Sequence, residues 1–206
     1  MNPLVNNTHI EQMTEVFYPD YNIKTLMEYV FLSDWFYDAE HIGVKIKSPV
    51  ELLVGLRKTV PYTFKKEQSA LAIQKLLGQA LLNPPNVAGW QGDKTWIDSN
   101  TIFMRLRLPS LLLSETHIST KEKGDFNDVL SQFIKRKKGE KQPFKTKVDW
   151  QLFDENFKDI NISDLEDYVL QTTIHPRTKS YLETLGSLSK RETCIQLMSL
   201  PEYQMC

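Results

Sequence analysis

Apolar positions along most of the chain recur every three or four residues, which is the period of one face of an α-helix. The strongest pattern lies in residues 67–82, where the apolar positions cover much of a helix's circumference: Leu71, Ile73, Leu76, Leu77, Ala80 and Leu81. This segment is predicted to be a central helix. No alternating apolar–polar run is longer than a few residues, so the pattern predicts an all-α fold.

Residues 23–31 carry a second apolar stripe, which predicts a helix with one buried side. The stripe consists of Ile23, Leu26, Met27, Val30 and Phe31, and Asn22 before it is a suitable N-cap. The aromatic run Trp35-Phe36-Tyr37 follows and is expected to pack into the core. Cys194 lies on an apolar helical face near the end of the chain and is expected to be a small core residue.

Helix starts are marked by serine and glutamate spaced three residues apart. Such a capping box is predicted at Ser48–Glu51, at Ser163–Glu166 and at Ser189–Glu192. Pro49 fits the first helical position, where its missing N–H costs nothing. Asp98 or Ser99 is expected to cap another helix, which Pro109 is expected to kink or end.

Between two predicted helices lies a loop rich in proline, glycine and tryptophan, with Asn83-Pro84-Pro85-Asn86-Val87-Ala88-Gly89-Trp90 at its centre. The prolines cannot continue a helix, and Gly89 and Gly92 allow sharp turns with positive φ. These features predict an ordered loop within an irregular multi-helix bundle. Trp90 and Trp96 either plug a gap between helices, which we favour, or form part of a binding site.

The composition is that of an ordinary globular protein, with 41% apolar and 25% charged residues among 206. The net charge of −1 gives no general attraction to nucleic acid or to an anionic membrane. The basic run from Lys135 to Lys141 is best explained as a solvated helix end, so nucleic acid is not an expected partner. No apolar run is long enough to span a membrane, and residues 1–7 do not resemble a signal peptide. A longer parent protein could carry an export signal, so the compartment is not predicted.

The composition along the chain predicts three parts. Residues 1–113 are expected to form a helical core that includes the loop. Residues 114–147 are expected to be a polar and basic connecting segment. Residues 148–206 are expected to form C-terminal helices that pack on the same core.

No recognised catalytic, nucleotide-binding or metal-binding motif occurs in the sequence. The four histidines lie far apart and the chain has only two cysteines, so neither a metal nor a cofactor is expected. Asp93 and Asp98 flank Trp96, and paired carboxylates are used in glycoside hydrolysis. A turn aspartate and a helix cap are the favoured explanation. If the loop binds a ligand, the candidate contacts are Asn86, Trp90, Asp93, Trp96, Asp98 and Arg105.

Several motifs occur together in this chain: Asn22-Ile23-Lys24-Thr25-Leu26, Ser33-Asp34-Trp35-Phe36, Lys47-Ser48-Pro49-Val50-Glu51-Leu52-Leu53-Val54, Leu77-Gly78-Gln79, Asn83-Pro84-Pro85-Asn86-Val87-Ala88-Gly89-Trp90, Trp96-Ile97-Asp98-Ser99 and Arg105. Together they resemble the DUF1800 family, a bacterial family of unknown function. The resemblance covers residues 17–113, and residues 197–204 look like the family's C-terminus. Family members are longer, so the chain resembles their C-terminal part. The resemblance implies no activity and no catalytic residues.

Two functions are consistent with the sequence. The first is a non-catalytic helical module that packs on the N-terminal part of a longer family protein or on another protein. The alternative is a carbohydrate-binding or hydrolase-like site at the Trp90 and Trp96 loop.

Overall fold

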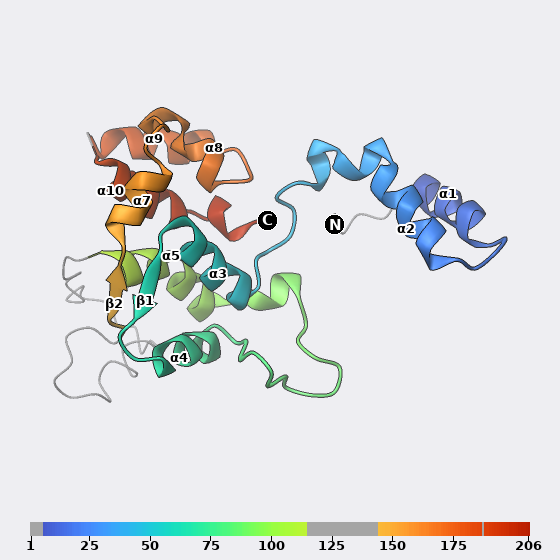
Figure 1. The fold of residues 1–206 in the computed structure, drawn as a ribbon, viewed down its shortest axis with the longest axis horizontal. Coiled ribbons are helices and arrows are strands. Elements are labelled where there is room, and N and C mark those ends of the chain that lie inside the picture. The colour runs from blue at the N-terminus through green and yellow to red at the C-terminus, as the bar shows by residue number, and fades with distance from the viewer. Residues whose placement is uncertain (1–5, 115–143, 187) are drawn as a thin grey trace. The chain divides into compact units, whose positions relative to one another are not determined.

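The computed structural model describes residues 6–114, 144–186 and 188–206. Helices dominate these residues, which confirms the all-α prediction (Figure 1). The basic run from Lys135 to Lys141 and most of the predicted connecting segment lie outside the described residues. The chain divides into two compact units: one ends at Lys45 and includes Cys206, and the other is Ile46–Met205. The three-part division predicted from composition stays a prediction.

The first unit is built from two α-helices and two short 3-10 turns. Helix α1 (Asn7–Phe17) and helix α2 (Ile23–Leu32) lie side by side, and the turns Asp34–Tyr37 and Ala39–His41 follow (Figure 1). The predicted N-cap of α2 is confirmed, because the side chain of Asn22 accepts a hydrogen bond of 3.0 Å from the Lys24 backbone N–H.

The predicted buried side of α2 is wrong for most of its residues. Val30 is the one buried residue of this helix, whereas Ile23, Met27 and Phe31 are exposed. Two helices cover only a narrow stripe of each other, so the rest of a broad apolar face stays uncovered. The expected core packing of Trp35-Phe36-Tyr37 is also only partial, since Tyr37 is exposed and the other two side chains are half-buried.

The second unit holds a larger hydrophobic core. Its helices are α3 (Pro49–Thr59), α4 (Gln68–Leu76), α5 (Ser99–Leu113), α7 (Trp150–Asn156), α8 (Leu165–Val169), α9 (Pro176–Thr184) and α10 (Lys190–Met198), with 3-10 turns at Asp93–Trp96, Ile162–Asp164 and Glu202–Gln204. Helices α3, α5, α8 and α10 supply much of the core, including Leu52, Leu56, Leu108, Leu112, Leu165 and Met198. Cys194 of α10 is fully buried, as predicted, and is a free thiol.

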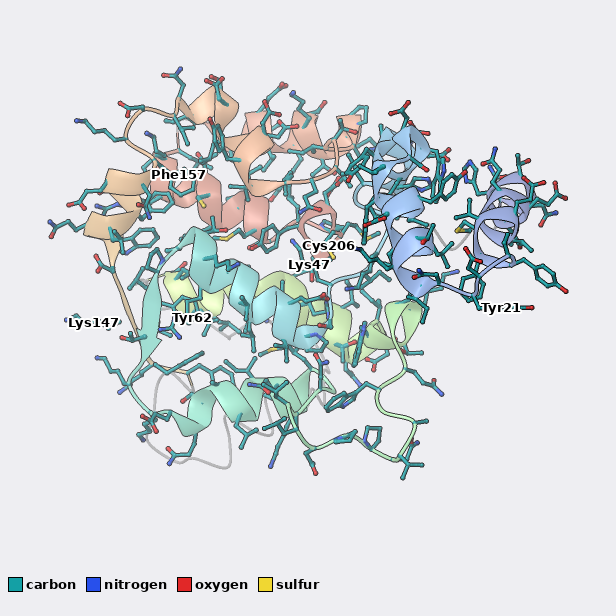
Figure 2. All side chains as sticks on the ribbon, turned by 45° about the vertical axis from the view of Figure 1, so that its right-hand side comes forward. Tyr21, Lys47, Tyr62, Lys147, Phe157 and Cys206 are labelled. Atoms are coloured by element: carbon teal, nitrogen blue, oxygen red, sulfur yellow. The ribbon has the colours of Figure 1, made fainter. Side chains whose placement is uncertain are left out.

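A short antiparallel pair of strands joins two distant segments of this unit. Strand β1 (Tyr62–Phe64) pairs with β2 (Thr146–Val148), and Thr63 lies opposite Lys147. Figure 2 shows Tyr62 and Lys147 on the two neighbouring strands. The pairing was not predicted, because a three-residue strand is too short to produce a clear alternating pattern.

Local hydrogen bonds settle most of the predicted helix starts. The capping boxes at Ser48 and Ser189 are confirmed; in each, the serine and the glutamate three residues later exchange hydrogen bonds with the other's backbone N–H. The box predicted at Ser163 is wrong, because this residue lies inside a 3-10 turn and its hydroxyl donates to the Asp164 carboxylate at 2.8 Å. Pro109 does not end α5, which continues to Leu113 and places Leu112 and Leu113 in the core.

The guanidinium of Arg105, in the middle of α5, is fully buried. Its Nε donates to the side-chain oxygen of Gln204 at 2.9 Å, and its Nη2 donates to the backbone oxygen of Lys47. The Lys47 backbone N–H donates in turn to the Gln204 backbone oxygen at 2.8 Å, so one side chain ties both ends of the second unit to α5. Burial lowers the pKa of Arg105 to about 10, which leaves the group charged at neutral pH.

Replacing Arg105 with alanine is expected to lower the free energy of unfolding by about 3 kcal/mol. The substitution leaves a cavity and removes the donors that satisfy the Lys47 carbonyl and the Gln204 side-chain oxygen. Urea unfolding followed by circular dichroism measures the loss. The control is Arg107→Ala on the same helix, whose side chain is half-buried and should cost less than about 1 kcal/mol. Equal losses for the two variants would contradict the anchoring role.

Candidate functional site

The loop that contains the candidate residues starts earlier than predicted, because α4 ends at Leu76 and not near residue 82. Gly78 has a φ of +90° just after the helix. The backbone N–H groups of Gly78 and Gln79 donate to the carbonyls of Lys75 and Gln74, which is the Schellman pattern that closes a helix. The apolar residues predicted to continue the helix therefore belong to the loop, and Leu81 is exposed.

Hydrogen bonds made by polar side chains hold the start of the loop. The Gln74 side-chain oxygen accepts from the Leu81 backbone N–H at 2.9 Å. The Gln79 side-chain oxygen accepts from the backbone N–H of Val50 at 3.0 Å, which fastens the loop to the first turn of α3. These contacts give the first part of the loop a defined path between two helices.

The middle of the loop turns at Asn86 and Gly89. The Asn86 side-chain oxygen accepts from the Ala88 backbone N–H at 2.9 Å, and its backbone oxygen accepts from the Gly89 N–H at 3.1 Å. Gly89 has the expected positive φ of +82°, but Gly92 does not; Asp93 takes a positive φ of +57° instead. The loop then enters the 3-10 turn Asp93–Trp96.

A pocket of about 320 Å³ lies between this loop and the start of α5. In Figure 1 the loop is the green stretch that joins α4 to α5. The wall includes Asn86, Trp90, Trp96 and Asp98 from the predicted set, together with Leu77 and Thr101. Asp93 and Arg105 do not line this pocket. The role of the four lining residues in ligand binding stays a prediction.

The two tryptophans contribute to the pocket in different ways. Trp96 is only 8% exposed, and its carbonyl accepts a hydrogen bond of 3.1 Å from the Thr101 hydroxyl. Trp90 is half-buried. Trp96 therefore fills space next to the pocket, while Trp90 keeps part of its surface exposed.

Asp98 is the cap of α5, as predicted. Its Oδ1 accepts from the backbone N–H groups of Asn100 and Thr101 at 2.7 and 2.8 Å. The hydrogen bond from Thr101, assisted by that from Asn100, holds the pKa of Asp98 below its usual value. A carboxyl group that donates a proton in glycoside hydrolysis needs a raised pKa, so Asp98 is unsuited to the role of general acid.

Thr101 is a pocket residue that the sequence-based prediction did not include. Its hydroxyl accepts from the Asp98 backbone N–H at 2.8 Å, which completes a capping box with threonine in the third helical position. The three-residue spacing from Asp98 to Thr101 could have identified it. Leu77 was predicted to face a helical core, and no local pattern marked it as part of a pocket.

Residues 6–114, 144–186 and 188–206 contain no group of three or more His, Cys, Asp or Glu side chains able to hold a metal ion. Over the same ranges, no helix has both the length and the apolar character needed to cross a membrane.

Comparison with known proteins identifies one family. The model of the family described as "Protein of unknown function (DUF1800)" matches residues 2–205. This stretch is longer than the two segments, residues 17–113 and 197–204, that carried the resemblance in the sequence. No curated protein matches the chain, and no solved structure matches it.

The two tryptophans should respond differently to truncation. Trp96→Ala is expected to lower the free energy of unfolding by about 3 kcal/mol, because it empties a buried site. Trp90→Ala is expected to cost about 1 kcal/mol, because its side chain is half-exposed before the change. Urea unfolding of the two variants measures the difference. A larger loss for Trp90 than for Trp96 would contradict these assignments.

Proposed function

The chain belongs to the DUF1800 family of unknown function, and from this premise we propose that it is a non-catalytic module that docks on another protein surface through helices α1 and α2. The expected occupant is a protein surface with its own apolar face. It is supplied either by the rest of a longer family protein or by a separate partner.

A row of exposed apolar side chains on α2 carries this proposal. Ile23, Met27 and Phe31 are 69%, 42% and 47% exposed. Their spacing of four residues places them along one edge of the helix, since residues four apart are neighbours on a helix surface. Soluble proteins rarely leave contiguous apolar surface uncovered unless it binds something.

The small core of the first unit supports the same proposal. Helix α1 has no buried residue and α2 has only Val30, although nearby rings contact one another, as His9 does by stacking on Trp35 at 4.2 Å. Polypeptides of about 40 residues seldom bury enough apolar surface to be stable alone. Covering the α2 row with a partner would add the apolar burial that this unit lacks.

The docking proposal predicts that the α2 row is accessible in the isolated protein. The chain should bind the dye anilinonaphthalene sulfonate or associate with itself at high concentration. Ile23→Lys combined with Met27→Lys should reduce both effects and leave the melting temperature nearly unchanged, because exposed positions tolerate lysine. Dye fluorescence and analytical ultracentrifugation provide the measurements.

Leu32→Lys is the matched control for this experiment. Leu32 is 82% exposed and lies half a turn round α2 from Ile23, at 3.6 residues per turn. It should leave dye binding and self-association unchanged. A double lysine variant that unfolds the protein, together with slow hydrogen exchange in α2, would contradict the proposal, because it would mean that the row is already covered.

A second candidate function is ligand binding in the loop pocket. The specific observation in its favour is that a half-buried and a buried tryptophan share one pocket of about 320 Å³ with the side chains of Asn86 and Asp98. Ligand sites typically combine apolar and aromatic walls with a few polar groups, and their volumes begin at about 300 Å³. One sugar ring is a ligand of the appropriate size.

A monosaccharide that occupies this pocket should raise the melting temperature, because it binds the native state alone. A panel of neutral sugars tested by differential scanning fluorimetry measures the effect. Trp90→Ala should abolish the shift while the protein still unfolds cooperatively. A sugar that stabilises the Trp90→Ala variant as strongly as the original chain would place its site elsewhere.

A further inference from the structure

We propose that the loop pocket binds a positively charged organic group, such as a quaternary ammonium or a guanidinium. This inference rests on the second candidate function, ligand binding in the pocket, and is independent of docking through α1 and α2.

The charge of the pocket wall is the first observation behind this proposal. Of the residues that line the pocket, Asp98 is the one with an ionisable side chain. Lysine, arginine and histidine are absent from the lining. Hydrogen bonds from Thr101 and Asn100 hold the Asp98 pKa below its usual value, so the carboxylate is ionised at neutral pH. A cation in the pocket would therefore meet one negative charge, on an exposed carboxylate that water partly screens, and no positive side chain among the lining residues.

The start of α5 also disfavours an anionic ligand. A helix N-terminus attracts anions through free backbone N–H groups. Here the Asn100 and Thr101 N–H groups already donate to the Asp98 carboxylate. The protein's own carboxylate occupies this end of the helix, so a second anion would meet a like charge there and would find these two N–H donors already used.

Tryptophan supplies the second attraction for a cation. Trp90 and Trp96 both line the pocket, and indole is the aromatic group that binds cations most strongly through its ring face. Partial burial of the two indoles increases this attraction, because less water competes with the rings for the cation. An aromatic wall together with one carboxylate is a combination that favours ammonium and guanidinium groups over neutral sugars.

The size of the pocket limits the ligand to a head group. A volume of about 320 Å³ is at the lower end of the range for ligand sites. Pro85 and Asn86 on the loop side are exposed, so a ligand's remaining atoms can extend into solvent past them. The pocket would accordingly recognise the charged end of a longer molecule.

The experiment compares choline with 3,3-dimethylbutan-1-ol, which has the same shape but no charge. Binding to the full chain is measured by titration calorimetry and by the indole N–H signals in the NMR spectrum. Choline should bind about fivefold or more tightly than the alcohol, because the alcohol lacks the charge that the carboxylate and the indoles attract. A neutral monosaccharide and inorganic phosphate are tested in parallel.

The substitution Asp98→Asn removes the negative charge of this side chain but keeps a residue that can cap α5. Asparagine caps helices as well as aspartate does, so the variant should fold normally. It should weaken choline binding about fivefold and leave the binding of the alcohol unchanged. Asp149→Asn is the matched control, because Asp149 is an exposed helix cap outside the pocket whose side chain accepts from the Leu152 N–H at 3.0 Å. It should change neither affinity.

Each outcome decides between the proposals. Choline binding that depends on charge, on Asp98 and on Trp90 supports the cation site. Equal affinities for choline and the alcohol, or equal binding by the Asp98→Asn variant, overturn the cation site. Sugar binding that depends on Trp90 without choline binding overturns the cation site and leaves the pocket as a ligand site. If none of the four compounds binds, both the cation site and the pocket function fail.

Discussion

The second unit of the chain depends on one buried charge. Arg105 lies in the middle of α5 with no exposed surface, and none of the described residues forms a carboxylate ion pair with it. Burying a charge is costly unless hydrogen bonds replace the lost water. Nε and Nη2 of Arg105 donate to the side-chain oxygen of Gln204, near the end of the chain, and to the backbone oxygen of Lys47, before α3. These segments must therefore meet at α5 for those two nitrogens to be hydrogen-bonded.

The packing around Gln204 follows from this meeting. The neighbouring Tyr203 is buried, and the Lys47 ammonium donates to its backbone oxygen at 2.7 Å while lying 3.8 Å from its ring centre. On α3, a Cβ added to Gly55 would lie 3.2 Å from the Tyr203 hydroxyl oxygen. A glycine in a helix interior costs about 1 kcal/mol of helix propensity. Here it provides the space in which the tyrosine packs.

Local and distant interactions explain which predictions succeeded. The caps at Ser48, Ser189 and Asp98 were predictable because each depends on residues within one helical turn. Arg105 was placed among candidate ligand contacts, whereas its hydrogen-bond partners are 58 and 99 residues away and no local pattern points to them. Among the polar candidate contacts, Asn86 and Asp98 line one pocket, whereas Asp93 and Arg105 do not line it.

Helix α5 carries the buried charge of Arg105, and residues at its start also form part of the pocket wall. Asp98 and Thr101 stand on the first turn of α5, and Arg105 anchors the same helix about one turn further on. One wall is therefore fixed by the core, as precise recognition requires. The opposite wall, with Asn86 and Trp90, belongs to a loop held by its own turns and by the contact of Gln79 with α3. Such a wall can adjust to a ligand without disturbing the core, because loops deform at lower cost than packed helices.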